Sequence, residues 1–304
     1  MNKPFKLKPI YKDYMWGGQK MITDLHKRTN INPCAEAWEF SCHDAGISYC
    51  DSGEYKGKTI KEIFQLHPEY LGKYANPNGT APILIKIIDA KDDLSIQVHP
   101  DDDYALKNED SMGKSEVWYI LDSDNGHLNI GFKENVNKDI IQNALVNGDI
   151  SNYMNHFSVT KGELYPINAG TLHSICSGCL LIEVQENSDL TYRLFDYNRV
   201  DNNGNKRPLH IDKALDVLNY NKYNKPAQNN VGYSCKYFSL STVFSPLNIN
   251  TSKDSFVVLI CIEGCCSIFY DNEQIDLQYG ESIFIPSDSS IKVDGQASFL
   301  RVDV

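Results

Sequence analysis

Short apolar segments separated by turn residues run along most of this 304-residue chain. Turn residues divide the last group of segments at Glu263-Gly264, Asp271-Asn272 and Tyr279-Gly280. This spacing predicts a mainly β protein built as an antiparallel barrel or sandwich. The expected strands cover residues 83–88, 94–99, 116–121, 128–132, 163–167, 180–185, 233–244, 256–262, 265–270, 274–277, 282–285 and 298–302.

Helical signals lie between the expected strands. Thr59 and Glu62 have the spacing of a capping box, which predicts a helix from this point. Apolar stripes predict two more helices, over residues 137–146 and 211–218. The acidic run 101–103 lacks the glycine and the later glutamate of a calcium loop, so it is interpreted as the first turn of a helix.

A polar stretch rich in Asn and Lys, residues 219–230, contains Pro226 and is typical of a linker. We therefore expect two domains, residues 1–225 and 226–304.

Charge and cysteine content narrow the functional classes. The formal net charge of -11 argues against a nucleic-acid partner and against an anionic membrane surface. The longest apolar run, residues 256–262, is too short to span a bilayer, and the N-terminus has no signal-peptide pattern. Nine cysteines without an export signal predict reduced thiols in a cytoplasmic protein. Cys176 and Cys179 form an isolated CxxC, which we interpret as a pair of core residues.

Residues 94–99 alternate apolar and polar side chains. Leu94, Ile96 and Val98 are expected on one face of a strand, and Gln97 and His99 on the other. The polar ends of Gln97 and His99 are then close enough to share an ion. One carboxylate and one further imidazole would complete a four-ligand N/O site of the kind that zinc accepts.

The segment from Gly162 to His173 resembles the second signature of the cupin family, with Asn168 in place of the usual proline. The same spacing returns between Gly280 and Ile291, where isoleucine replaces the histidine. The resemblance implies two cupin-type jelly-roll barrels. The first would carry the metal and the inserted helices, and the second would be degenerate.

Several blocks resemble type I mannose-6-phosphate isomerase, and together they cover most of residues 6–198. They are Tyr14-Met15-Trp16-Gly17-Gly18, Glu36-Ala37-Trp38-Glu39, residues 94–105, Gly113-Lys114-Ser115-Glu116, residues 169–173 and residues 185–193. The resemblance implies one Zn²⁺ per chain, bound by Gln97, His99, Glu116 and His173. It also implies Arg193 and Lys114 as catalytic residues. The expected activity is the interconversion of mannose 6-phosphate and fructose 6-phosphate, with a phosphorylated hexose as the partner molecule.

Aldose–ketose isomerisation moves a proton between C1 and C2 through an enediolate, whose negative oxygen needs fixed positive charge. Zn²⁺, Arg193 and Lys114 could supply that charge. The base stays open: a zinc-bound water, Lys114 or a carboxylate near the metal would each serve. Lys86 interrupts the apolar run 83–88 and could point into the pocket, but we favour the interpretation that it reaches the barrel rim. A local basic excess is a candidate collar for a phosphate; its members are Arg193, Arg199, Lys206 and Arg207.

Two other functions compete with the isomerase. Two histidines and one carboxylate also describe a non-haem iron dioxygenase, although Gln97 would fill a position that O₂ chemistry needs open. A sugar-phosphate-binding cupin without catalysis is the third hypothesis. The sequence does not predict an oligomeric state.

Overall fold

The computed structural model describes residues 2–200, 204–225 and 232–304. Within these residues the strands pair antiparallel in three sheets, which confirms the predicted mainly β protein. The six-stranded sheet has the order β10 (Leu164–Ile167), β7 (Glu116–Ser123), β12 (Cys179–Glu186), β5 (Ile83–Ala90), β3 (Glu36–Phe40), β2 (Ile10–Lys12). The five-stranded sheet has the order β13 (Tyr192–Phe195), β6 (Ile96–Val98), β11 (His173–Ile175), β8 (His127–Phe132), β9 (Met154–Ser158).

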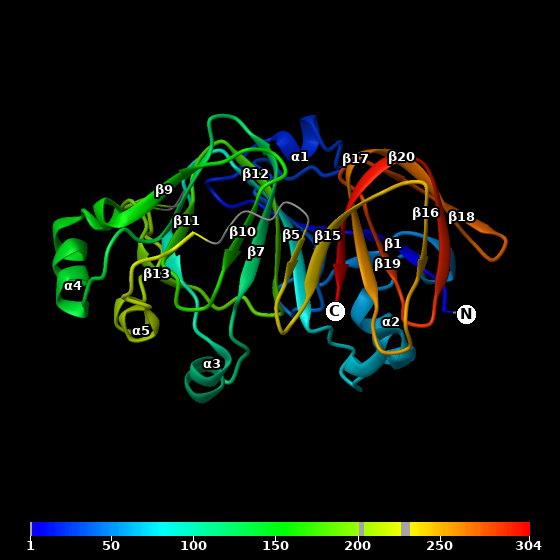
Figure 1. Ribbon diagram of the computed structural model, residues 1–304, viewed down its shortest axis with the longest axis horizontal. Helices are drawn as coiled ribbons and strands as arrows, with labels where there is room; N and C mark the ends of the chain where they lie inside the picture. Colours follow the sequence, from blue (N-terminus) through cyan, green and yellow to red (C-terminus); the bar gives the residue numbers. More distant parts are fainter. Residues whose placement is uncertain (1, 201–203, 226–231) are drawn as a thin grey trace.

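The third sheet has nine strands. Its main path is β14 (Gly232–Ser234), β15 (Ser239–Phe244), β20 (Ser290–Asp303), β17 (Val257–Tyr270), β19 (Ser282–Ile285), β1 (Phe5–Lys8), β4 (Tyr49–Cys50). Two further strands, β16 (Leu247–Asn250) and β18 (Glu273–Gln278), pair with β20 and β17. Figure 1 shows this sheet beside the other two along the long axis, as expected for two barrels. The six-stranded and five-stranded sheets are called the first barrel, and the nine-stranded sheet is called the second barrel.

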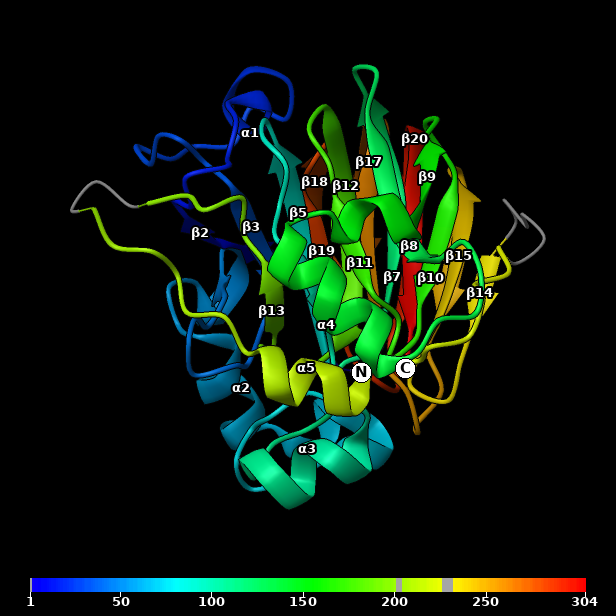
Figure 2. The same cartoon turned by 90° about the vertical axis from the view of Figure 1, so that its left-hand side faces the viewer.

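The helices lie around the sheets. They are α1 (Lys20–Thr23), α2 (Ile60–Leu66), α3 (Asp102–Glu109), α4 (Lys138–Asn147) and α5 (Ile211–Val217), with 3₁₀ turns at Gly53–Tyr55, Pro68–Tyr74 and Ile150–Tyr153. Figure 2 shows α4 and α5 in front of the five-stranded sheet. The predicted capping box is present at Thr59 and Glu62. Asp101 caps α3 through the Tyr104 amide, so the acidic run begins a helix as predicted.

The six-stranded sheet is buried on both faces. On β5, Ile85 and Ile87 belong to a core shared with Val258 and Phe284 of the nine-stranded sheet. Ile88, on the opposite face, packs inside the first barrel. Because side chains alternate along a strand, Lys86 also faces the barrel interior. A strand buried on both faces explains the nearly continuous apolar run at 83–88.

Three strand predictions change. The segment predicted at 233–244 is two strands, β14 and β15, separated by residues 235–238. The segments predicted at 256–262 and 265–270 are one strand, β17, with a register shift between Cys261 and Glu263. Gly264 has a φ of +74°, so the expected turn is an irregularity within a long strand. Leu94 precedes β6 and packs inside the first barrel, apart from Ile96 and Val98, which lie in the core under α4 and α5.

The predicted linker lies partly outside the described residues, which exclude 226–231. The domain division at 225/226 stays a prediction. β1, from the first predicted domain, joins the sheet of the second, because Phe5 pairs with Phe284 of β19. No helix among the described residues is long and apolar enough to cross a membrane. All nine cysteines are free, Cys176 and Cys179 are buried as expected for core residues, and burial raises the pKa of both thiols.

Candidate metal centre

Two facing sheets bring the candidate residues together. On the five-stranded sheet, Gln97 lies between Arg193 and His173 in register. On the six-stranded sheet, Glu116 pairs with Gln185, and the next inward row places Glu183 between Trp118 and Lys86. Gln97, Glu116 and His173 therefore converge because each occupies an inward position on its own strand, and His99 and Lys114 lie just outside β6 and β7.

The closest group consists of His99, Glu116 and His173, all buried, whose ligand atoms lie within 4.8 Å of one another. Nε2 of His99 is 3.7 Å from Glu116 Oε2, and Nε2 of His173 is 3.5 Å from Oε1. His99 Nδ1 lies 2.7 Å from the Leu190 carbonyl, and His173 Nδ1 lies 2.9 Å from the Thr171 carbonyl. These carbonyls can only accept, so each Nδ1 carries the proton and each Nε2 presents a lone pair to the same point.

This group fits a divalent cation such as zinc. Oε1 of Glu116 is buried, and no hydrogen-bond donor among the described residues reaches it, whereas buried carboxylate oxygens are normally satisfied. Two neutral imidazoles and one carboxylate are ordinary zinc ligands. The Gln97 amide joins them, with Nε2 at 3.3 Å from His173 Nε2 and Oε1 accepting from the Ser95 hydroxyl. The roles of the four residues as ligands stay predictions.

The electrostatics of the site keep both imidazoles neutral. Burial lowers the pKa of His173 to about 4, and burial with the nearby Lys114 ammonium lowers that of His99 well below its usual range. Burial and the neighbouring Glu183 carboxylate raise the pKa of Glu116. A cation at the point where the three residues meet would offset the free energy needed to keep a buried Glu116 ionised.

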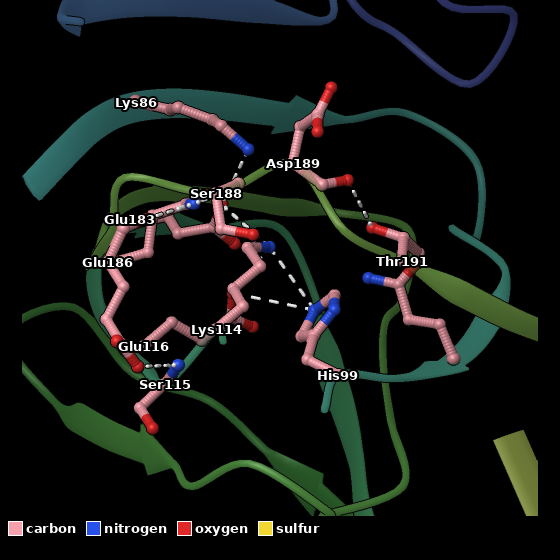
Figure 3. Close-up of polar contacts among 12 residues, drawn as sticks. Lys86, His99, Lys114, Ser115, Glu116, Glu183, Glu186, Ser188, Asp189 and Thr191 are labelled. Atoms are coloured by element: carbon pink, nitrogen blue, oxygen red, sulfur yellow. Dashed lines mark hydrogen bonds and ion pairs between the residues drawn. The ribbon is translucent and has the colours of Figure 1, made fainter. Parts of the chain in front are cut away.

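Two lysines and Glu183 extend the site (Figure 3). Lys114 Nζ lies 2.8 Å from Glu116 Oε2, 3.2 Å from His99 Nε2 and 3.6 Å from Glu183 Oε1. Lys86 Nζ lies 2.9 Å from the same Glu183 oxygen, and Trp118 donates to the other at 3.0 Å. The interpretation of Lys86 as a rim residue was therefore wrong, since its side chain is 8% exposed.

A cavity of about 240 Å³ opens beside these residues. Its lining includes Gln97, Lys114, Glu183, Arg193 and Arg207. Arg193 Nε is buried with no hydrogen-bond partner among the described residues. Burial and the charge of Arg207 lower the pKa of Arg193. Two guanidinium groups on one cavity wall, one of them with an unmet donor, favour an anionic ligand.

The predicted basic collar is divided. Arg207 donates from Nε to Asp196 at 2.8 Å and lines the cavity beside Arg193. Arg199 donates to Asp196 Oδ1, which Arg207 Nη2 also reaches, and to the Asp93 carbonyl. Lys206 donates to Asn198 at 3.0 Å. Neither Arg199 nor Lys206 lines this cavity.

A larger cavity of about 740 Å³ lies near α1, lined by Gly18, Lys20, Asp89 and Ser177 among others. None of the four predicted ligands lines it, so the size of a cavity does not identify the active site in this protein.

Sequence reasoning missed Glu183 and Trp118. Both lie in segments that were predicted as strands, and a carboxylate within the apolar run 180–185 was a usable signal. In the second barrel, Ile291 replaces the signature histidine and packs in an apolar core. Among the described residues, His99, Glu116 and His173 form the one group of this kind.

The fold and this group define a cupin-type enzyme with a candidate metal centre in its first barrel. Residues 4–136 match the family description "Phosphomannose isomerase type I, catalytic domain", and residues 231–304 match "Mannose-6-phosphate isomerase, cupin domain". The chain is 37% identical to "Probable mannose-6-phosphate isomerase GmuF" of Bacillus subtilis over 99% of both chains. It therefore belongs to the type I mannose-6-phosphate isomerase family, and is an aldose–ketose isomerase.

Solved structures agree with this assignment. The crystal structure of the mannose 6-phosphate isomerase from Bacillus subtilis superposes with a TM-score of 0.88, at 30% identity over 100% of both chains. A mannose 6-phosphate isomerase structure with bound zinc and yttrium shares the fold, with a TM-score of 0.76 and 19% identity over 98% of both chains.

Proposed function

We propose that this chain interconverts mannose 6-phosphate and fructose 6-phosphate through an enediolate, with one Zn²⁺ held by His99, Glu116, His173 and Gln97. The observation that carries the proposal is the His–Glu–His group beside a cavity that also contains Lys114 and Arg193. Zinc, when bound, supplies Lewis-acid stabilisation of a developing oxyanion. The structure of a family relative with zinc supports this choice of metal.

The residues of the chain divide the remaining work. Lys114 carries a positive charge at the metal end of the cavity, where it stabilises negative oxygen on the sugar. Arg193 and Arg207 line the same cavity and provide guanidinium groups suited to a diolate or a phosphate. We propose that Arg207 contributes to phosphate binding, because Asp196 holds its guanidinium in place.

Glu183 is a further candidate for the base that moves the proton between C1 and C2. It lines the cavity and is not one of the proposed ligands. Burial alone would raise its pKa, but the Lys114 and Lys86 ammonium groups outweigh burial and lower it. Glu183 is therefore ionised at neutral pH and has lone pairs free for a proton, although the two ammonium groups that keep it ionised also weaken it as a base; Lys114 beside it is able to return a proton.

A coupled assay across a panel of hexose and pentose phosphates, with metal analysis of the same sample, tests the proposal. We expect turnover of mannose 6-phosphate that chelation abolishes and zinc restores. Full turnover by a sample shown to be metal-free would refute the role of the metal. Binding of the sugar phosphate without isomer exchange by NMR would favour the non-catalytic hypothesis. Oxygen consumption that follows iron content would favour the dioxygenase.

A further inference from the structure

The short segment before β7 carries Lys114 and ends at Glu116, so its placement decides the geometry of the cavity. Its backbone is fastened from two sides by carboxyl groups. Gly113 donates its amide to Asp102 Oδ1 at 3.1 Å, and Ser115 donates its amide to Glu186 Oε1 at 2.8 Å. Lys114 lies between these two anchors, and its own amide binds the Pro100 carbonyl at 3.0 Å.

The two carboxyl groups also interact with each other. Glu186 is 1% exposed, and its Oε2 has no hydrogen-bond donor among the described residues. Burial raises the pKa of Glu186 to about 7, and the Asp102 carboxylate contributes to this rise. A proton on Glu186 removes the repulsion between the two groups and supplies a donor toward Asp102.

The C-terminal part of the chain completes the arrangement. Tyr237, between β14 and β15, donates its hydroxyl to Asp102 Oδ2 at 2.6 Å, and Lys236 donates to the same oxygen at 3.0 Å. Tyr237 also packs against the core shared by the two barrels. Tyr237 and Asp102 are 135 residues apart in sequence. Their hydrogen bond joins the second barrel to Asp102, which in turn holds the loop that carries Lys114.

We propose that Asp102 and Glu186 are positioning residues that hold Lys114 in the cavity, and that Tyr237 of the C-terminal part orients Asp102 for this task. The activity measurements that follow from this rest on the proposed isomerase function. The second barrel then contributes to turnover without touching the substrate.

The first test compares two variants with the same chemical change. Tyr237→Phe removes the hydroxyl that binds Asp102. Tyr270→Phe removes a hydroxyl that donates to Glu273 at 3.0 Å in a distant hairpin of the same barrel. We expect amide hydrogen exchange in residues 112–116 to accelerate several-fold in Tyr237→Phe and to stay unchanged in Tyr270→Phe. Unchanged exchange in both variants would overturn the proposal, and this readout does not depend on activity.

The second test separates positioning from a general loss of structure. Glu186→Ala removes the acceptor for the Ser115 amide, and a displaced catalytic group costs about tenfold or more in kcat. Glu186→Gln keeps an acceptor for Ser115 and a donor toward Asp102, so its kcat should stay within about twofold of wild type. KM and zinc content should change little in either variant. Equal losses in Ala and Gln variants, or an Ala variant with wild-type kcat, would contradict the positioning role.

Failure of the proposed function gives a different pattern. A wild-type protein that turns over no sugar phosphate, but shows the exchange difference between Tyr237→Phe and Tyr270→Phe, refutes the isomerase reaction and retains the positioning contact. An active wild type without the exchange difference refutes the positioning contact alone.

Discussion

Lys86 and Glu183 form an ion pair across neighbouring strands inside the first barrel, with 2.9 Å between Nζ and Oε1. Their side chains are 8% and 4% exposed. Lys114 approaches the same oxygen at 3.6 Å, so one carboxylate serves two ammonium groups. This arrangement keeps Glu183 ionised in a site where burial alone would favour its protonated form.

Lys86→Met should destabilise the metal-free protein by about 3 kcal/mol, because it leaves a buried carboxylate without its closest partner. Adding Glu183→Leu to this variant should recover part of the loss. Urea denaturation measures both. Lys213→Met is the matched control: Lys213 is 49% exposed and pairs with Glu109, so its loss should cost about 0.5 kcal/mol or less. Equal losses in the two single variants would contradict the buried ion pair.

Glu116→Gln should abolish zinc binding and yet leave the metal-free protein at least as stable as wild type. Oε1 of Glu116 is buried, and none of the described residues donates a hydrogen bond to it, so neutralising this group is expected to stabilise the fold by about 1 kcal/mol. Metal analysis and denaturation of the same samples test both parts. Glu273→Gln, which changes a carboxylate paired with Lys3 at the surface, should retain zinc. A zinc-free variant that is clearly less stable than metal-free wild type would argue for a structural role instead.

Local rules in the sequence place Gln97, His99 and His173, whereas Glu116 was expected only from the family resemblance. Alternation along 94–99 predicts Gln97 and His99 on one face; in the structure Gln97 lies on β6 and His99 directly follows that strand. Gly170, with a φ of +82°, makes the turn before His173, and a residue with a Cβ there would come within 2.9 Å of the Val217 carbonyl. Such constraints act within a few residues and are therefore visible in the chain itself.

The roles of Lys86 and Glu183 required the tertiary structure. Both faces of β5 and β12 are buried, so an apolar run does not reveal which residues face the barrel interior. Short strands were missed for a different reason. β13, for example, has only four residues, and its pairing partner β6 lies far away in sequence.

His173 should contribute stability to the metal-free protein that is lost as the pH falls from about 6.5 toward about 4, while the raised pKa values of Glu116 and Glu186 act in the opposite direction. The pKa of buried His173 is lowered to about 4, so between these values the unfolded chain takes up a proton that the folded chain does not. Because one pKa unit corresponds to about 1.4 kcal/mol, this residue contributes up to about 3 kcal/mol across the window. The low pKa of Glu183 adds a loss below about pH 4.5. Denaturation of His173→Asn as a function of pH should show a shallower slope than wild type; an identical slope would exclude His173 as a source.

Arg193 and Arg207 should affect turnover in different ways. Arg193 is paired with Gln97 on the neighbouring strand, and its buried Nε has no partner among the described residues, so we expect it to meet charge that develops during the reaction. Arg193→Ala should lower kcat by about 100-fold with zinc retained. Arg207 is anchored by Asp196, and Arg207→Ala should mainly raise KM for the phosphorylated hexose, because binding to the phosphate is the same in substrate and transition state.

Steady-state kinetics with metal analysis distinguishes the two effects. Arg301→Ala is the matched control, since Arg301 pairs with Asp303 on β20 and lines no part of the cavity. Its kcat and KM should equal those of wild type. Wild-type kcat in Arg193→Ala would remove this residue from the chemistry. An unchanged KM in Arg207→Ala would indicate that another cationic side chain of the cavity wall binds the phosphate. Lys12, which also lines the cavity, is the next candidate.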